Sequence, residues 1–345
     1  MRYSVYLIIL FILIEIFFRT FFKEFNSSDV SYNLESDIRV VKGIKSHNYK
    51  DKSFERLVIR VENKDDTIQF SESKKIYFLG DSITYGYGVD FNETYHQKLK
   101  VKNNLDYQII AASEFGVTAE EIFETITKMD KIISPGDILV YQFNYNDIIP
   151  IKKNLNKSES PEKNIIKKIK KNTYYFRYKY LNRSVFFQVL QHYASVITNT
   201  KDGSCEERGK NALGQYTYTY FSKKYFDESK ILWNNFDVSI KNIAHSLRQK
   251  KVKFYVLISP ISLQLSNHST NNKFNLDINC SELDGRDYLL KLLKNNNIKF
   301  IDPLDKLALN QSSSKDLLFQ QFDTNHLNSK GHQLVSESIY ETLFN

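Results

Sequence analysis

The sequence contains few of the residues that hold metal ions or form disulfide-rich folds. Its 345 residues include only two cysteines, Cys205 and Cys280, and no C-x-x-C pair. The seven histidines show no H-x-x-x-H or H-E-x-x-H spacing. These absences disfavour a metal-dependent enzyme, and we expect no metal and no other cofactor. The two cysteines are either ordinary thiols or, if they lie outside the cytoplasm, partners in one disulfide.

An excess of positive charge is also missing from most of the chain. The formal net charge is +8, but residues 152–183 alone contribute +9, from eleven Lys or Arg and two Glu. The rest of the chain is therefore close to neutral, which does not support nucleic-acid binding. Apolar and aromatic residues are abundant, at 41% and 14%, so we expect a folded protein with one large domain or two modest ones.

The chain opens with an apolar run from Tyr3 to Phe18 that is interrupted chiefly by Glu15. Arg19 follows Glu15 by four residues and can pair with it on one helix face. No small-residue cleavage site follows the run, so we interpret residues 1–25 as an uncleaved signal anchor that spans a membrane. An amphipathic helix lying in the membrane interface is disfavoured, because the run is apolar almost all round.

Residues 26–73 are polar apart from two short alternating stretches, 38–44 and 57–61, and we expect a stalk with a peripheral hairpin there. From residue 74 to 345, strand and helix patterns alternate, which predicts an α/β fold with a parallel sheet. The expected strands are 76–79, 107–111, 138–143, 253–259 and 298–301. Helices are expected at 94–102, from 118, at 229–249, at 283–294 and at 330–343, and Thr118 with Glu121 predicts a capping box.

The alternation of strands and helices breaks at residues 148–222, which predict an insert of helical-hairpin type. Its segment 167–180 is basic and aromatic, and apolar residues between 185 and 197 recur at helical spacing. One interpretation is a solvated basic face over a small helical subdomain. The other is a lid that touches an anionic surface, either lipid headgroups or an acidic polysaccharide.

The stretch 74–88, K-K-I-Y-F-L-G-D-S-I-T-Y-G-Y-G, predicts a buried strand that ends in a tight turn carrying Ser82. Ligands bind to open α/β sheets at the carboxyl edge of the strands, where a serine has free backbone N–H groups beside it. Such a position suits an activated nucleophile. The alternative is a plain helix cap, because Asp and Ser are both good N-cap residues.

Further polar or glycine residues are expected at the same edge, namely Gly116, Asn146 and the late stretch 323–326, D-T-N-H. Attack by a serine on an acyl carbon needs a base, and histidine titrates near neutral pH. An aspartate three residues before the histidine can orient it. Backbone N–H groups and an Asn amide can stabilise the developing oxyanion.

With these residues in place, the sequence resembles the SGNH, or GDSL, hydrolase family. The resemblance rests on G-D-S-I-T-Y-G at 80–86, the loop glycine at 116, N-Y-N-D at 144–147 and D-T-N-H-L-N-S-K-G-H at 323–332. Asn144 stands where the third motif usually begins with glycine, so we expect an adjusted backbone there, since Asn tolerates positive φ. Ala111 and Ser113 stand where many members carry Asn and Gly.

The resemblance implies a flavodoxin-like, three-layer α/β/α fold with a five-stranded parallel sheet. It also implies a role for each residue that matches a motif. Ser82 would be the nucleophile, His326 the base and Asp323 the partner of that base. The oxyanion hole would consist of Ser82, Gly116 and Asn146.

The activity that the resemblance implies is hydrolysis of carboxyl esters through an acyl-enzyme, on a small-molecule, lipid or acylated-glycan substrate. The alternative is an O-acetyltransferase that uses the same residues to move an acyl group to or from a glycan. An inactive binding protein is disfavoured because no member of the triad is missing. His332 is interpreted as a helix-face or supporting residue. The apolar run and stalk resemble membrane-anchored bacterial members, which implies a single-pass protein with residues 26–345 outside the cytoplasm.

Overall fold

The computed structural model describes the chain in segments, and it forms two compact units, Met1–Ile44 with Lys152–Gly203 and Lys45–Ile151 with Ser204–Asn345. The described residues are 2–21, 30–33, 38–41, 47–50, 52–54, 57–62, 68–71, 73–103, 107–144, 147–148, 184, 186–187, 189–190, 223–261, 264–265, 284–313, 318–320 and 325–345.

The first unit contains helix α1, Arg2–Phe21, and the antiparallel strands β1, Val30–Asn33, and β2, Ile38–Val41. The expected pair between Glu15 and Arg19 forms in α1, at 2.9 Å, and the Ser184 hydroxyl donates to Glu15 at 2.7 Å. In the part of the chain that the structure describes, no helix is long and apolar enough to cross a membrane. The predicted transmembrane anchor therefore has no support in this structure.

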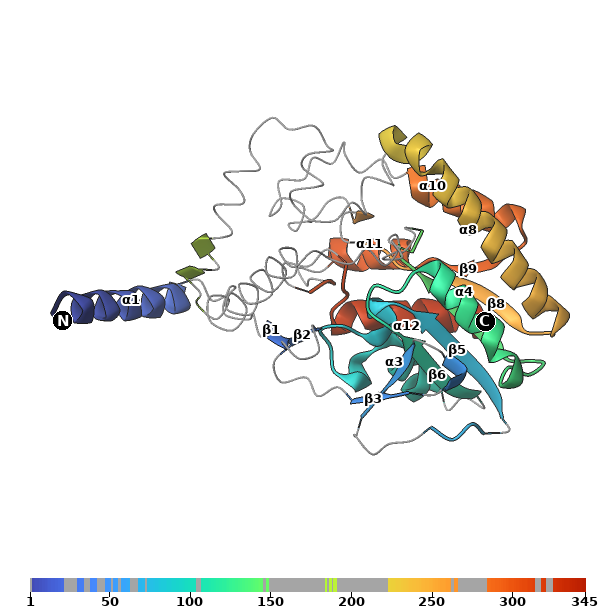
Figure 1. Cartoon of the computed structure of the whole chain (residues 1–345), viewed down its shortest axis with the longest axis horizontal. Helices are drawn as coiled ribbons and strands as arrows, with labels where there is room; N and C mark the ends of the chain where they lie inside the picture. The colour runs from blue at the N-terminus through green and yellow to red at the C-terminus, as the bar shows by residue number, and fades with distance from the viewer. Residues whose placement is uncertain are drawn as a thin grey trace, which may run out of the picture. The chain divides into compact units, whose positions relative to one another are not determined.

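The second unit contains a seven-stranded sheet with the order β3-β4-β6-β5-β7-β8-β9 (Figure 1). Five neighbouring strands, β6, β5, β7, β8 and β9, pair in parallel. Strand β4 pairs antiparallel with β6, and β3 pairs antiparallel with β4. The strands are β3 His47–Tyr49, β4 Val58–Val61, β5 Lys74–Gly80, β6 Tyr107–Ser113, β7 Ile138–Phe143, β8 Lys253–Ile258 and β9 Lys299–Ile301.

The five parallel strands lie where the sequence predicts them, and the order 2-1-3-4-5 that results is that of flavodoxin-like sheets. The prediction of a five-stranded sheet is nevertheless wrong, because β3 and β4 extend the sheet beyond β6. Strand β4 comes from the stretch expected in a peripheral hairpin. Its residues Val58 and Ile59 are buried and lie opposite Ser113 and Ala112 of β6.

Alternating side chains of β5 enter two separate cores, one on each face of the sheet. Tyr77 and Leu79 pack in one core with α4, α8 and α10, whereas Ile76 and Phe78 pack in the other with α3, α11 and α12. The result is three layers, with helices on both faces. The helices are α3 Tyr95–Asn103, α4 Ala119–Lys128, α8 Lys223–Gln249, α10 Asp284–Asn295, α11 Leu304–Ser313 and α12 Ser329–Phe344.

Strand β5 is the point at which the order of the strands reverses. It lies between β6 and β7, and the chain passes first to β6 on one side and then to β7 on the other. In open α/β sheets, ligands bind beyond the carboxyl ends of the strands at this switch point. The residues that follow β5 and β7 are therefore at the position where a site is expected.

Candidate active site

Strand β5 ends at Gly80, and Ser82 begins the short helix α2, Ser82–Tyr85. Asp81 is the N-cap residue, and its Oδ1 accepts a hydrogen bond from the N–H of Ile83 at 2.9 Å. Gly86 ends the helix with φ of 76°, a left-handed conformation that suits glycine. The strand, the cap and the glycine together hold Ser82 at the carboxyl edge of the sheet.

The turn before Ser82 packs closely against β7. A side chain at Gly80 would overlap Thr84 and Gln142, which explains the glycine at this position. The side-chain oxygen of Gln142 accepts from the Asp81 N–H at 3.1 Å and from the Thr84 hydroxyl at 2.9 Å. Through these bonds, β7 fixes the backbone on the N-terminal side of Ser82.

The structure brings Ser82 and His326 together, although 244 positions separate them in the sequence. Ser82 Oγ lies 2.8 Å from His326 Nε2, and both residues are partly exposed. This distance is short enough for proton transfer between the hydroxyl and the imidazole. A serine beside a histidine base at a switch point can act as a nucleophile.

His326 is held by a short antiparallel bridge between Phe319 and Leu327. The N–H of Gln320 donates to the His326 carbonyl at 2.8 Å, and the Gln320 side-chain amide donates to the carbonyls of Leu327 at 2.9 Å and Gly88 at 3.2 Å. Gln320 therefore joins the segment around His326 to the turn that follows Ser82. Sequence reasoning missed Gln320, and no local pattern marks it.

Aromatic rings line one side of the serine–histidine pair. The ring of Tyr87 lies 4.6 Å from the His326 imidazole, centroid to centroid, at an angle of 48°. Phe115 lies 4.7 Å from Tyr85 and 5.8 Å from Tyr87. This wall limits the directions from which a substrate can approach and offers it an apolar contact surface.

Gly116 has φ of 65°, and a side chain built on it would meet nothing within 4 Å. Its loop is held to β5 by a bond from the Glu114 N–H to the Gly80 carbonyl at 3.3 Å. Among the described residues, no partner accepts from the backbone N–H of Ser82 or of Gly116. These are the free donors that an oxyanion hole requires.

Several predicted residues lie outside the described part of the chain. These are Asp323, expected to orient His326, and Asn146, expected in the oxyanion hole. Most of the basic insert at 148–222 and both cysteines, Cys205 and Cys280, also lie outside it. Their roles remain predictions. In the described segments, no group of three or more His, Cys, Asp or Glu residues could hold a metal ion.

The backbone at Asn144 differs from the expectation. The only described non-glycine residues with positive φ are Lys251 and Asn297, so Asn144 does not take the conformation that glycine would allow. Its side chain instead donates to Asp81 Oδ2 at 2.7 Å. Asn144 therefore does not use the positive φ that asparagine tolerates, and its side chain forms a bond that glycine cannot.

Two carboxyl groups lie buried beside this bond. Asp81 and Asp147 are 1% and 2% exposed, and burial raises the pKa of both. Asp147 Oδ2 accepts from the Tyr141 hydroxyl at 2.6 Å and from the Asn144 N–H at 3.0 Å. In the described region, Asp147 Oδ1 has no partner. The pKa of Asp147 is raised further by the nearby charge of Asp81, which favours the neutral form of Asp147.

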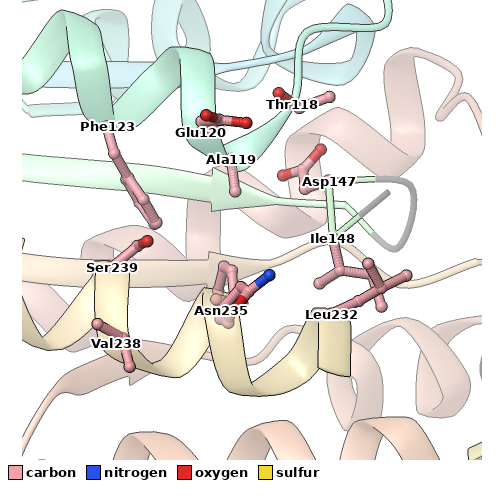
Figure 2. Close-up of a pocket in the computed structure, with 11 residues that line it drawn as sticks. Thr118, Ala119, Glu120, Phe123, Asp147, Ile148, Leu232, Asn235, Val238 and Ser239 are labelled. Carbon is pink, nitrogen blue, oxygen red and sulfur yellow. The ribbon is translucent and has the colours of Figure 1, made fainter. Parts of the chain in front are cut away.

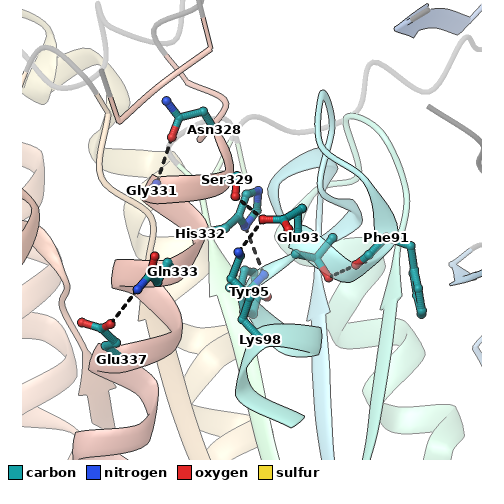
Figure 3. A network of polar contacts seen from close by, with 11 residues as sticks. Phe91, Glu93, Tyr95, Lys98, Asn328, Ser329, Gly331, His332, Gln333 and Glu337 are labelled. Atoms are coloured by element: carbon teal, nitrogen blue, oxygen red, sulfur yellow. Dashed lines mark hydrogen bonds and ion pairs between the residues drawn. The ribbon is translucent and has the colours of Figure 1, made fainter. Parts of the chain in front are cut away.

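Two buried histidines lie on the other side of the nucleophile turn. The N–H of Tyr95 donates to His332 Nδ1 at 3.3 Å (Figure 3), and His96 Nε2 donates to the Thr84 carbonyl at 3.1 Å. Burial lowers the pKa of each imidazole to about 3. Both rings are therefore neutral near pH 7, and the bond from Tyr95 joins His332 of α12 to the first residue of α3.

Arg60 of β4 was not identified from the sequence. Its guanidinium donates to the carbonyls of Tyr85 and Gly86 at 3.0 Å and of Val89 at 2.8 Å, and it lies over the Tyr85 ring. Arg60 thus holds the C-terminal end of the helix that begins with Ser82. A lone arginine in the apolar stretch V-I-R-V was the only signal for it.

A cavity of about 350 Å³ lies between α4 and α8 (Figure 2). Its wall is mixed, with apolar side chains beside carboxyl, amide and hydroxyl groups. It reaches the nucleophile turn through Asp147, because Asp147 bonds Asn144 and Asn144 bonds Asp81. A volume and a mixed wall of this kind suit a small ligand. The lining residues are Thr118, Ala119, Glu120, Phe123, Asp147, Ile148, Leu232, Asn235, Phe236, Val238 and Ser239.

Comparison with known proteins gives similar structures but no match by sequence. No protein-family model matches the chain, and no curated protein is significantly similar to it. A lipolytic G-D-S-L family protein from Veillonella parvula is 14% identical over 79% of this chain and 98% of its own, with a TM-score of 0.39. A putative one from Desulfitobacterium hafniense is 12% identical over 78% and 99%, with a TM-score of 0.41.

A third solved structure that is similar to this chain is the acetyl xylan esterase AlAXEase. It is 16% identical over 78% of this chain and 100% of its own, with a TM-score of 0.39. Identities and TM-scores this low carry no information about substrate or activity.

Proposed function

We propose that this chain is a serine esterase of the SGNH type that hydrolyses carboxyl esters through an acyl-enzyme on Ser82. The observation that carries the proposal is the distance of 2.8 Å between Ser82 Oγ and His326 Nε2 at the switch point of the sheet. A serine hydroxyl is a weak nucleophile unless an adjacent base takes its proton. The free N–H groups of Ser82 and Gly116 supply the second requirement, stabilisation of the oxyanion.

In the first half of the reaction, Ser82 Oγ attacks the ester carbonyl carbon while His326 Nε2 takes the hydroxyl proton. The Ser82 and Gly116 N–H groups donate to the carbonyl oxygen as it gains negative charge. When the tetrahedral intermediate collapses, the bond to the alcohol oxygen breaks and His326 returns its proton to that oxygen. The alcohol leaves, and the acyl group remains bonded to Ser82.

In the second half, water attacks the acyl carbon and His326 takes a proton from it. Collapse of the second intermediate breaks the bond to Ser82 Oγ, which regains its proton from His326. The acid leaves and the enzyme is restored. If a sugar hydroxyl takes the place of water, the same steps transfer the acyl group, so the two activities differ only in the acceptor.

The test is turnover of aryl acetates, longer aryl esters and acetylated sugars by the full-length chain. Ser82→Ala should reduce kcat by roughly 10³–10⁶-fold and abolish covalent labelling by an organophosphonate. Ser259→Ala is the matched control. Ser259 directly follows the parallel strand β8, much as Ser82 follows β5, but it is buried at 2% exposure, so the variant should keep its activity. Turnover by Ser82→Ala within tenfold of wild type would contradict the proposal.

The same assay separates hydrolysis from transfer. Acyl ester is incubated with and without a sugar acceptor, and the products are separated by mass. Free acid as the main product in both reactions supports the esterase. Acyl-sugar formed in excess of free acid would assign the chain to the O-acyltransferases instead.

A further inference from the structure

The side chain of Asn144 reaches from one strand end to the nucleophile turn on the next. Asn144 follows β7, Asp81 follows β5, and these two strands are neighbours in the sheet. The Asn144 amide donates to Asp81 Oδ2 at 2.7 Å, and the two residues are only 5% and 1% exposed. The bond thus crosses the switch point within a buried environment, directly beside Ser82.

Both oxygens of the Asp81 carboxyl accept hydrogen bonds from groups that can only donate. Oδ1 accepts from the Ile83 N–H at 2.9 Å, and Oδ2 accepts from the Asn144 amide. A protonated Asp81 would give up one of these bonds or leave its own proton without an acceptor. Donors aimed at a buried carboxyl favour its charged form and oppose the effect of burial. The geometry is therefore that of a carboxylate.

The position of Asn144 is fixed independently of its bond to Asp81. The Asn144 N–H donates to Asp147 Oδ2 at 3.0 Å, and the Asp147 N–H donates back to the Asn144 carbonyl at 2.9 Å. This closed turn sets the direction of the Asn144 side chain before it meets Asp81. Removal of the amide therefore takes away a donor and leaves the turn in place.

Asp81 lies close to His326, because Asp81 directly precedes Ser82 and the Ser82 hydroxyl lies 2.8 Å from His326 Nε2. In agreement with this placement, His326 lowers the pKa of the Asp81 carboxyl against the effect of burial. In the proposed reaction, His326 becomes positive when it takes the Ser82 proton. A fixed negative charge at a buried position stabilises that form more than it would in water. Three other titratable groups interact with Asp81, namely Tyr95, Tyr141 and Asp147, and burial raises the pKa of each, which favours its neutral form.

We propose that Asn144 is a positioning residue, which holds Asp81 as a carboxylate beside Ser82 so that its charge supports the positive form of His326. This inference rests on the proposed function for its role in turnover. Its physical part, the coupling of Asn144 and Asp81 to His326, does not depend on any substrate. Asn144 acts through Asp81 and does not touch the reacting atoms.

The first measurement is the titration of the His326 imidazole by NMR in the full-length chain. Asn144→Ala and Asp81→Asn should each move the His326 titration to lower pH, by roughly one pH unit, because the nearby negative charge is weakened or lost. The double variant should titrate where Asp81→Asn does, since Asn144 acts only through the carboxylate. Equal His326 titration in wild type and both single variants would overturn the inference.

The second measurement is turnover of a small aryl acetate. Asn144→Ala should lower kcat about tenfold to a hundredfold with little change in KM. When Asp81 is already replaced by Asn, the additional change Asn144→Ala should hardly alter kcat. Asn296→Ala is the matched control, because Asn296 also donates to a carboxyl, Asp237 Oδ1, at 2.9 Å but lies between α10 and α8. A kcat within threefold of wild type for Asn144→Ala would refute the role in turnover.

The two measurements separate this inference from the proposed function. If the wild-type chain turns over no ester while His326 still shifts in Asn144→Ala, the coupling holds and the esterase proposal fails. If turnover is normal and His326 does not shift, the esterase proposal holds and the role of Asn144 fails. Asp81→Asn changes charge with almost no change in shape, so it tests the same coupling if Asn144→Ala does not fold.

Discussion

Two clusters of buried ionisable groups flank Ser82, and burial shifts the pKa values of the two clusters in opposite directions. On the β7 side, Asp81 and Asp147 have raised pKa values. On the α3 side, His96 and His332 have pKa values lowered to about 3. In both clusters burial disfavours charge, but only Asp81 has donors on both carboxyl oxygens to oppose it. Hydrogen bonds thus favour a negative charge on Asp81 on one side of the serine, whereas both imidazoles on the other side are neutral near pH 7.

The same comparison distinguishes two histidines that lie close together in the sequence, His326 and His332. His326 is partly exposed and hydrogen-bonded to Ser82, whereas His332, six residues later, is 1% exposed and accepts from the Tyr95 N–H. A base must change its charge during turnover, and a ring that is fully buried and neutral cannot do so at low cost. His326, and not His332, therefore meets the requirements of the proposed base.

The largest expected effect tests the difference between His326 and His332 directly. His326→Ala should reduce kcat by at least about 10³-fold and leave stability nearly unchanged. His332→Phe keeps the ring that stacks on Tyr95 but removes the acceptor, so it should cost about 1–3 kcal/mol in the free energy of unfolding. Its kcat per folded molecule should stay within threefold of wild type. Ester turnover and urea unfolding of the two variants check both statements.

The opposite result would remove the distinction. If His332→Phe lost as much turnover as His326→Ala while remaining folded, His332 would belong to the reacting groups. If His326→Ala were active, the pairing with Ser82 would have no catalytic meaning.

The second effect concerns acid. An imidazole with a pKa of about 3 when folded and 6.5 when unfolded binds a proton only in the unfolded chain between these values. The free energy of unfolding should therefore fall as the pH falls from 6.5, by about 1.4 kcal/mol per pH unit for each such imidazole. The raised pKa values of Asp81 and Asp147 act with the opposite sign, since protonation of these groups favours the folded state as the pH falls.

Comparison of wild type with His332→Phe isolates the contribution of His332 to the pH dependence of the unfolding free energy. The dependence of unfolding free energy on pH should be flatter in His332→Phe than in wild type by about one proton between pH 4 and 6. Urea unfolding at several pH values measures both slopes. Parallel slopes would show that His332 is protonated in the folded state and that the two clusters do not differ as described.

The sequence predicted those parts of the fold and site that depend on local patterns. The five parallel strands follow from apolar runs that end at turn residues, and the Thr118 capping box begins α4 as expected. The sequence places Ser82 and His326 at one edge of the sheet, and the structure brings their side chains within hydrogen-bond distance, while their catalytic roles stay predictions. The strands and the capping box are specified by residues that are neighbours in the sequence.

The parts that the sequence did not predict depend on contacts between distant segments. Strand β4 joins the sheet through antiparallel pairing with β6, more than 50 positions away, and Arg60 then reaches the end of α2. The bond from Asn144 to Asp81 spans 63 positions, and it uses a side chain that the glycine usual at this point of the motif would lack. No periodicity or turn signal in these stretches specifies their partners.

The smallest expected effect concerns the exposed edge of the histidine cluster. Glu93 bonds Lys98 of α3 and Ser329 of α12 (Figure 3), and Lys98 first and then Ser329 lower the pKa of Glu93. Its side chain is 42% exposed, so solvent and salt screen the ion pair. Glu93→Gln should therefore cost only about 0.2–1 kcal/mol, and less at high salt.

The sign of the Glu93 contribution follows from its lowered pKa. The stabilisation is present above the ordinary pKa of 4.5 and is lost as the pH falls through the lower folded value. Urea unfolding of wild type and Glu93→Gln at pH 7, in low and high salt, measures it, with Lys128 and Glu124 of α4 as an exposed i,i+4 pair for comparison. A loss as large as that of His332→Phe, unchanged by salt, would show that the edge of the cluster is as well shielded from water as its centre.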